Sequence, residues 1–128
     1  MKHRIFLEQL PESAKVYPED NGYWVTPDGR IFSTKLKRPY ELKQFRLNKK
    51  TDYQCVGCTK DGRVRKRYVH RMVAETFLPR VSENLEVNHI DHNKTNNVVE
   101  NLEWVSRVDN MRKAYEYHRG YGVTKMSN

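Results

Sequence analysis

The hydrophobic pattern of the chain changes once, near residue 69. Before that point, short runs of strand type are separated by turn residues, most clearly on either side of Asp28-Gly29 and of Asp61-Gly62. An Asp-Gly turn between two such runs is typical of a β-hairpin. The pattern therefore predicts two hairpins, preceded over residues 1–20 by a short helical or irregular arm. The predicted strands are residues 23–25, 30–33, 42–47, 53–59 and 63–69.

From residue 69 the apolar side chains follow helical spacing. They mark one face of a short helix, and Pro79 is expected to stop it because a proline ring cannot continue a helix. The residues of that face are Val69, Met72, Val73, Ala74, Phe77 and Leu78.

Strand character returns at residues 85–89 and again at residues 102–105. Residues 91–97 between these two runs are rich in asparagine and aspartate, which favour turns. We therefore expect two strands joined by a long loop.

The last predicted element is a helix. Ser106 is a candidate N-cap with Asp109 three residues later, so the helix is expected from about Arg107 to Tyr117, with Gly120 ending it. Its apolar side chains are expected to pack inward; they are Val108, Met111 and Tyr115.

These elements predict an α+β fold. Its first part, residues 1–69, is basic and rich in β-hairpins, and residues 70–120 contain a C-terminal ββα unit followed by a tail at 121–128. A chain of 128 residues is long enough for one compact domain, or for a small catalytic module with one extension that holds a substrate.

Positive charge is concentrated in the middle of the chain. Residues 30–71 hold 14 of the 24 lysines and arginines but only three acids, although the net charge of the whole chain is +8. This distribution predicts a polyanion as partner, because lysine and arginine neutralise phosphates; a basic surface kept for solubility is the alternative. The candidate DNA contacts are Arg30, Lys35, Lys37, Arg38, Arg63, Arg65 and Arg67, together with Arg107 and Lys113 from the last helix.

Membrane association is not expected. The basic residues lie in strand-like sequence rather than in an amphipathic helix. No apolar run is long enough to span a bilayer, and the first residues lack a signal-peptide core, so the prediction is an intracellular protein.

Cys55 and Cys58 form a single C-x-x-C pair inside a predicted strand. A zinc site would need a second pair of cysteines or histidines at suitable spacing. Two buried thiols are the favoured interpretation, and a zinc-structured binding module in which His70, His89 or His92 completes the site is the alternative.

Asn88, His89 and Asn110 are candidates for an active site that cleaves phosphodiester bonds. Cutting a phosphodiester requires an activated water and stabilisation of the charge that develops, and histidine is a suitable base near neutral pH. A divalent ion can stabilise both the phosphate and the leaving oxygen. His89 is the candidate base, and Asn88 and Asn110 are the candidate oxygen ligands for the ion.

Several motifs in order resemble the HNH endonucleases encoded by phages and mobile introns, which share a ββα-metal (His-Me) finger. They are His70–Phe77, Val87-Asn88-His89-Ile90-Asp91, Asn93–Asn97 and Asn101–Val105. The resemblance implies catalytic roles for His89, as general base, and for Asn101, which would fasten the loop by backbone hydrogen bonds. It also implies metal binding by Asn88 and Asn110. Residues 22–33 look like the small DNA-binding module that often precedes this motif.

The chain departs from that family at two positions. Asn88 replaces a carboxylate, so both expected metal ligands are neutral, and Mg²⁺ normally takes carboxylates as well as phosphate oxygens. His92 stands where glycine is usual, and histidine tolerates the left-handed backbone better than most residues; phosphate contact or zinc binding are further possibilities for it. Asp91 is either a reserve ligand or the first residue of an Asx turn.

The expected function is that of a DNA endonuclease dependent on Mg²⁺ or Mn²⁺, with Zn²⁺ as the less favoured ion. The expected enzyme nicks double-stranded DNA as a monomer or weak dimer, in the cytoplasm of a bacterial host and from a phage gene. The alternative is a catalytically inactive regulatory or packaging protein that keeps the finger as a scaffold for DNA binding.

Overall fold

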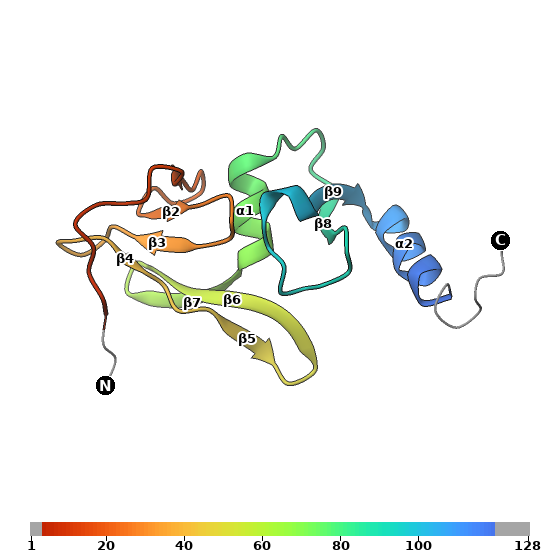
Figure 1. Cartoon of the computed structure of the whole chain (residues 1–128), viewed down its shortest axis with the longest axis horizontal. Coiled ribbons are helices and arrows are strands. Elements are labelled where there is room, and N and C mark those ends of the chain that lie inside the picture. The colour runs from red at the N-terminus through yellow and green to blue at the C-terminus, as the bar shows by residue number, and fades with distance from the viewer. Residues whose placement is uncertain (1–3, 120–128) are drawn as a thin grey trace.

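The computed structural model describes residues 4–119 and confirms the predicted α+β class. Helix α1 lies in the middle of the molecule, between the N-terminal sheet and the C-terminal β8–β9 hairpin (Figure 1). The elements in chain order are β1 (Lys15–Val16), β2 (Tyr23–Val25), β3 (Ile31–Ser33), β4 (Tyr40–Glu41), β5 (Phe45–Asn48), β6 (Thr51–Lys60), β7 (Arg63–Tyr68), α1 (Val69–Phe77), β8 (Leu85–His89), the 3₁₀ turn η1 (Val99–Asn101), β9 (Leu102–Ser106) and α2 (Arg107–Arg119).

The first predicted hairpin is confirmed as β2–β3, in an antiparallel sheet with the strand order β1-β2-β3-β4. Gly29 in its turn has a φ of +92°, a conformation that glycine adopts without strain. The arm before it contains no helix between residues 4 and 20. It instead pairs strand β1 with β2, and Phe6 bridges to Tyr40, because the sheet edges offer unpaired backbone groups.

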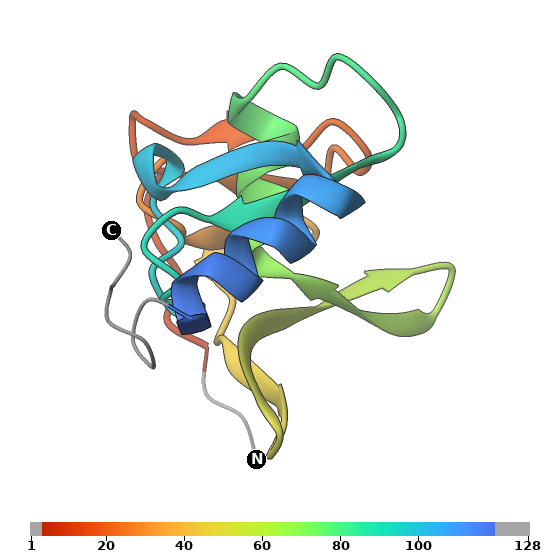
Figure 2. The same ribbon diagram turned by 90° about the vertical axis from the view of Figure 1, so that its right-hand side faces the viewer.

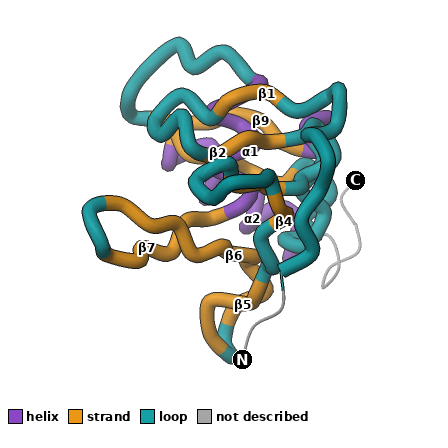
Figure 3. Tube along the Cα trace, turned by 90° about the vertical axis from the view of Figure 1, so that its left-hand side faces the viewer, coloured by secondary structure: helices purple, strands orange, loops and turns teal. Residues whose placement is uncertain are grey.

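The second predicted hairpin is confirmed as β6–β7 and projects from the body of the molecule (Figure 2 and Figure 3). Asp61 and Gly62 both have positive φ, of 54° and 76°, as a two-residue hairpin turn requires. The strand expected at residues 42–47 is divided in two. Residues 40–41 pair with β3, and residues 45–48 pair with β6. Leu42 separates the two strands, because its N–H donates to the Ile31 carbonyl and its side chain packs against the core.

Helix α1 forms the centre of the hydrophobic core. Val69, Met72 and Val73 are fully buried, and they belong to one cluster with side chains from both β2 and β9. The helix ends at Phe77, two residues before Pro79, as predicted. Because α1 contacts β6 and β8 as well, it connects the basic hairpins to the C-terminal unit.

The C-terminal unit is a ββα arrangement with His89 opposite Leu102 in the strand register. The Ser106 hydroxyl accepts the Asp109 N–H at 3.0 Å, which confirms the predicted N-cap. The end of α2 at Gly120 and the tail at 121–128 lie outside the described residues.

The predicted inward packing of α2 is wrong. Val108, Met111 and Tyr115 are 73%, 64% and 60% exposed, because the core already fills the other face of the β8–β9 hairpin and α2 covers only its outer side (Figure 2). No helix among residues 4–119 is long and apolar enough to cross a membrane.

Candidate active site

An open cavity of about 280 Å³ lies between β8, α2 and the beginning of β6. Three of the predicted site residues line it together, namely Asn88, His89 and Asn110. Asn101 is not one of the residues that line it within the described part of the chain. Further lining residues are Tyr53, Val87, His92, Lys94, Met111, Ala114, Tyr117 and His118.

His89 is 4% exposed and ends strand β8. Its Nε2 lies 2.6 Å from Oδ1 of Asn97. An amide oxygen only accepts, so Nε2 carries the hydrogen and donates it, and Nδ1 of the neutral ring keeps the lone pair. Burial lowers the pKa of His89, and the Asn97 hydrogen bond and the charge of Asp91 offset part of that shift. The ring is therefore an unprotonated base at neutral pH.

Asn97 was missed by sequence reasoning, because one asparagine among several in a loop has no distinguishing signal. The turn of the β2–β3 hairpin holds its backbone in place. The Val99 N–H donates to the Pro27 carbonyl at 2.8 Å, and a Cβ on Gly29 would lie 2.9 Å from the Asn97 carbonyl oxygen. The glycine thus permits a close approach between the first hairpin and the loop that positions His89.

Asn101 and Asp91 fasten the loop between β8 and β9. Oδ1 of Asn101 accepts the Asp91 N–H at 3.0 Å, and its Nδ2 donates to Oδ1 of Asp91 and to the Asn96 carbonyl. Oδ1 of Asp91 also accepts the Asn93 N–H at 2.8 Å, as in an Asx turn, and hydrogen bonds from Asn96 and this backbone group help to hold the pKa of Asp91 low. Both carboxylate oxygens are thus used within the loop rather than reserved for a metal.

His92 adopts the left-handed backbone conformation, with a φ of 63°. The turn therefore keeps the geometry that a glycine would give it. The imidazole ring stacks on Tyr117 of α2, with centroids 3.8 Å apart. His92 and Tyr117 together form one wall of the cavity.

The amide groups of Asn88 and Asn110 each donate to a carboxylate. Nδ2 of Asn88 lies 2.7 Å from Glu103, and Nδ2 of Asn110 lies 2.9 Å from Glu86. Neither glutamate was among the predicted site residues, because a polar residue on the outer face of a strand looks the same in the sequence whether or not it contacts a site.

Aromatic rings pack behind the candidate base. The His70 ring lies 5.0 Å from those of both His89 and Tyr53. Burial, with smaller contributions from His89 and Arg71, lowers the pKa of His70 to about 3. His70 is therefore neutral, and its buried Nδ1 has no hydrogen-bond partner among residues 4–119.

The donor set at the cavity fits a hard divalent cation. Oδ1 of Asn88 and Oδ1 of Asn110 are amide oxygens of the kind that Mg²⁺ and Mn²⁺ accept, with water or phosphate as the other ligands. In the described part of the chain, no three His, Cys, Asp or Glu side chains gather as a metal site. Such an ion would depend on the two asparagines and on oxygens from outside the protein.

Cys55 and Cys58 are free, buried thiols. They are three residues apart on β6, so their side chains point to opposite faces of the sheet and cannot bind the same ion. Burial raises the pKa of Cys58 to about 11, which keeps its thiol protonated.

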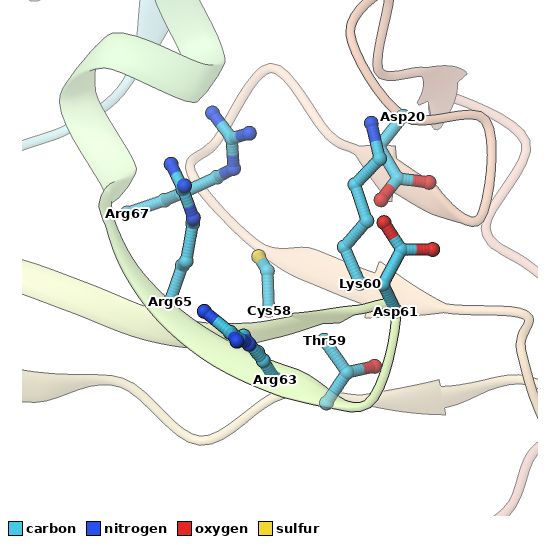
Figure 4. Close-up of a pocket in the computed structure, with 8 residues that line it drawn as sticks. All are labelled: Asp20, Cys58, Thr59, Lys60, Asp61, Arg63, Arg65 and Arg67. Carbon is cyan, nitrogen blue, oxygen red and sulfur yellow. The ribbon is translucent and has the colours of Figure 1, made fainter.

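The predicted DNA contacts separate into two groups. Arg63, Arg65 and Arg67 project from one face of β7 and line a cavity of about 580 Å³ (Figure 4). No carboxylate within residues 4–119 forms an ion pair with Arg63 or Arg65. Arg67 is close to Glu19, at 3.6 Å.

Most of the other predicted DNA contacts form ion pairs with carboxylates of the same chain. Arg30 pairs with Glu41 at 2.8 Å, Lys35 with Asp20 at 2.9 Å and Arg38 with Glu8 at 3.5 Å. On α2, Lys113 lies 3.9 Å from Glu103, whereas Arg107 and Lys37 are exposed.

The chain is similar to known nucleases in sequence and in structure. The family described as HNH endonuclease matches residues 67–112. YosQ of Bacillus subtilis, named as an SPbeta prophage-derived HNH homing endonuclease, is 40% identical over 93 residues, which is 72% of this chain and 51% of YosQ. The DNA endonuclease I-HmuI of Bacillus phage SP01 is 34% identical over 89 residues, which is 70% of this chain and 49% of I-HmuI.

A solved structure of I-HmuI, titled for DNA binding and cleavage, superposes with a TM-score of 0.71 at 32% identity. The superposition covers 82% of this chain and 59% of the I-HmuI chain. The chain thus spans about half the length of the curated relatives named above.

Proposed function

The chain contains a domain of the HNH endonuclease family, and we propose that it is a divalent-metal-dependent DNA endonuclease that nicks one strand of a duplex. One observation carries the proposal. The buried, neutral His89 lies in the same cavity as Asn88 and Asn110, whose amide oxygens can bind a hard cation. This arrangement supports a base and a metal site within one hydrolytic centre.

His89 is the general base in this proposal. Its Nδ1 takes a proton from the attacking water, while Nε2–H stays hydrogen-bonded to Asn97 and keeps the ring in one tautomer. The imidazolium that forms is stabilised by the same hydrogen bond and by the nearby Asp91 carboxylate. Asn101 acts indirectly, since it holds the loop that carries Asp91 and Asn97.

Asn88 and Asn110 would hold the divalent cation, Mg²⁺ or Mn²⁺, through their side-chain oxygens. When bound, such an ion supplies positive charge to the phosphate and to the leaving 3′-oxygen. With water as the nucleophile, the products carry a 5′-phosphate and a 3′-hydroxyl. Because neither protein ligand is charged, we expect weak affinity for free metal until DNA contributes a phosphate oxygen.

The β-rich part up to residue 69 would hold the duplex, and the rest of the described chain would cut it. The arginines of β7 are suited to phosphate contacts, which position DNA without reading its sequence. Several relatives are named from phages or a prophage, which supports action on DNA in the cytoplasm of a bacterial host, as a monomer or weak dimer.

Cleavage of supercoiled plasmid tests this function. The wild type is expected to produce nicked circles with Mg²⁺ or Mn²⁺ and none with EDTA, and His89→Ala is expected to lower the rate by about 100-fold or more. Retained DNA binding by the variant controls for folding. Equal activity of the two proteins would remove His89 as base. Binding without cleavage by the wild type, with either ion, would support the inactive regulatory alternative instead.

A further inference from the structure

We propose that Glu86 and Glu103 are positioning residues, which turn the oxygens of Asn110 and Asn88 toward the metal and supply the negative charge that these ligands lack. The inference rests on the proposed metal-dependent function and adds two residues that act through the ligands.

The four side chains come from three elements that face one another. Glu86 and Asn88 are two residues apart on β8 and therefore share a face of the hairpin. Glu103 on β9 is the cross-strand partner of Asn88, which places it on that face too. Asn110 reaches the same face from α2 and bonds Glu86 at 2.9 Å, while Asn88 bonds Glu103 at 2.7 Å.

The chemistry of the partners determines which way each amide points. A side-chain amide can present either its oxygen or its nitrogen to a neighbour, and an ionised carboxylate can only accept hydrogen bonds. Each glutamate therefore selects the orientation in which Nδ2 faces it. The oxygens of Asn88 and Asn110 are then directed away from the carboxylates. Both asparagines line the cavity, whereas neither glutamate is among the described residues that line it.

The same contacts place charge next to the neutral ligands. A hydrogen bond to a carboxylate polarises the amide and increases the electron density on its oxygen, which strengthens that oxygen as a ligand. Lys113, at 3.9 Å from Glu103, offsets only part of the charge because its side chain is exposed. The charge that a carboxylate at position 88 would bring is thus supplied by groups one hydrogen bond further from the metal.

Metal binding provides the first test. Mn²⁺ affinity is measured from the electron paramagnetic resonance signal of the free ion, with a short DNA duplex present and in the His89→Ala background, which keeps the duplex intact. Glu86→Gln and Glu103→Gln are each expected to weaken Mn²⁺ binding by about tenfold or more. Glu83→Gln removes the same charge at an exposed position three residues before Glu86 and is expected to bind Mn²⁺ as tightly as the parent protein.

A reciprocal variant separates positioning from loss of structure. Asn88→Asp combined with Glu103→Gln moves the carboxylate to the ligand position and leaves an amide behind it, and this pair is expected to bind Mn²⁺ at least as tightly as the parent. In the metal-free protein, the side-chain NH₂ signals in ¹H–¹⁵N spectra report whether each asparagine NH₂ is hydrogen-bonded to its glutamate. Glu103→Gln is expected to shift the signals of Asn88, and Glu86→Gln those of Asn110.

The outcomes distinguish the two proposals. A parent protein that binds no Mn²⁺ with DNA present would overturn the metal-dependent function, and this inference with it. A parent that binds Mn²⁺, with both glutamine variants binding equally well and the NH₂ signals unmoved, would overturn the inference alone. Weakened binding in the single variants and recovery in the reciprocal one would support it.

Discussion

The rings of His70 and His89 lie 5.0 Å apart, and burial lowers the pKa of both. Their hydrogen bonding differs. Asn97 accepts from Nε2 of His89, whereas Nδ1 of His70 is buried and has no partner among residues 4–119. A proton is therefore better accommodated on His89 than on His70. At the residue scale this difference separates the candidate base from its packing partner.

The role of Asn97 leads to a first prediction. Asn97→Ala is expected to lower kcat by about 10-fold to 100-fold, because His89 loses the partner that fixes its tautomer. Asn97→Asp places a negatively charged carboxylate next to Nε2–H and is expected to raise the pKa of His89. Since the base must be unprotonated, the acid limb of the profile of kcat/KM against pH is expected to move to higher pH.

Asn84→Asp is the matched control for this shift, since Asn84 lies in an exposed loop before β8. Its profile is expected to coincide with that of the wild type. A profile of Asn97→Asp that also coincides would contradict the assigned hydrogen bond.

The buried His70 predicts loss of stability in acid. Its pKa is about 3 in the folded chain, against 6.5 as the ordinary value, so below pH 6.5 the unfolded chain binds a proton that the folded chain rejects. Above pH 6.5, His70 is expected to have no effect on how the free energy of unfolding depends on pH. Between pH 6.5 and about pH 3 this site lowers the free energy of unfolding by about 1.4 kcal/mol for each pH unit.

Urea unfolding at pH 7.5, 6.0 and 5.0 measures this dependence. His70→Phe keeps an aromatic ring against Tyr53 and removes the titrating group, so its stability is expected to fall less steeply in acid. Equal slopes in the wild type and the variant would show that His70 is not the responsible group.

At the element scale, the turn of the β2–β3 hairpin has a second function beyond joining two strands. It contacts the loop that carries Asn97, through Pro27 and through the close approach at Gly29. The hairpin therefore supports the position of His89 although it is distant in sequence. The long β6–β7 hairpin also has two roles, because Tyr53 of β6 packs against His70 beside the candidate base and β7 carries Arg63, Arg65 and Arg67 along its length.

Two glycines make the supporting role of this turn testable. Gly29 and Gly62 both have positive φ, so replacement of either by alanine is expected to cost about 1–3 kcal/mol of stability. Only at Gly29 would the new Cβ meet backbone, at Asn97, because nothing lies within 4 Å of a Cβ at Gly62.

Gly29→Ala is therefore expected to lower cleavage by roughly tenfold or more, since small displacements of catalytic groups are costly, while Gly62→Ala keeps wild-type cleavage of DNA at a permissive temperature. Similar activity in the two variants would argue against support of the loop by the turn.

At the scale of the whole molecule, charge is distributed more selectively than composition suggests. The chain carries +8 overall, but Arg30, Lys35 and Arg38 form ion pairs within the fold, whereas Arg63 and Arg65 of β7 form none with a carboxylate of residues 4–119 and line an open cavity. We therefore expect the face of β7 to contribute more to DNA binding than the N-terminal sheet does.

Salt dependence measures that contribution. Replacement of Arg63 and Arg65 together by alanine is expected to weaken duplex binding and to reduce the slope of log K against log salt by about 0.9 for each phosphate that the variant no longer neutralises. Arg30→Ala, which removes a cation already paired with Glu41, is expected to have the smaller effect. The reverse order would place the DNA on the N-terminal sheet.

Local patterns determined much of this protein. The two hairpins, helix α1 before Pro79, the ββα order and the N-cap at Ser106 were all predictable, because strand period, turn residues and helix caps act over a few neighbouring positions. The same holds for the grouping of Asn88, His89 and Asn110, since a hairpin followed by a short helix brings its ends together.

The tertiary structure decided what surrounds those residues. Asn97 as the partner of His89, Glu86 and Glu103 behind the two asparagines, and the carboxylates that pair with Arg30 and Lys35 all come from contacts between separate elements. The exposure of Met111 on α2 belongs here too. Periodicity predicts which side of a helix or strand is apolar. The pairing of polar groups from different elements depends on how those elements pack, and local sequence patterns do not encode that packing.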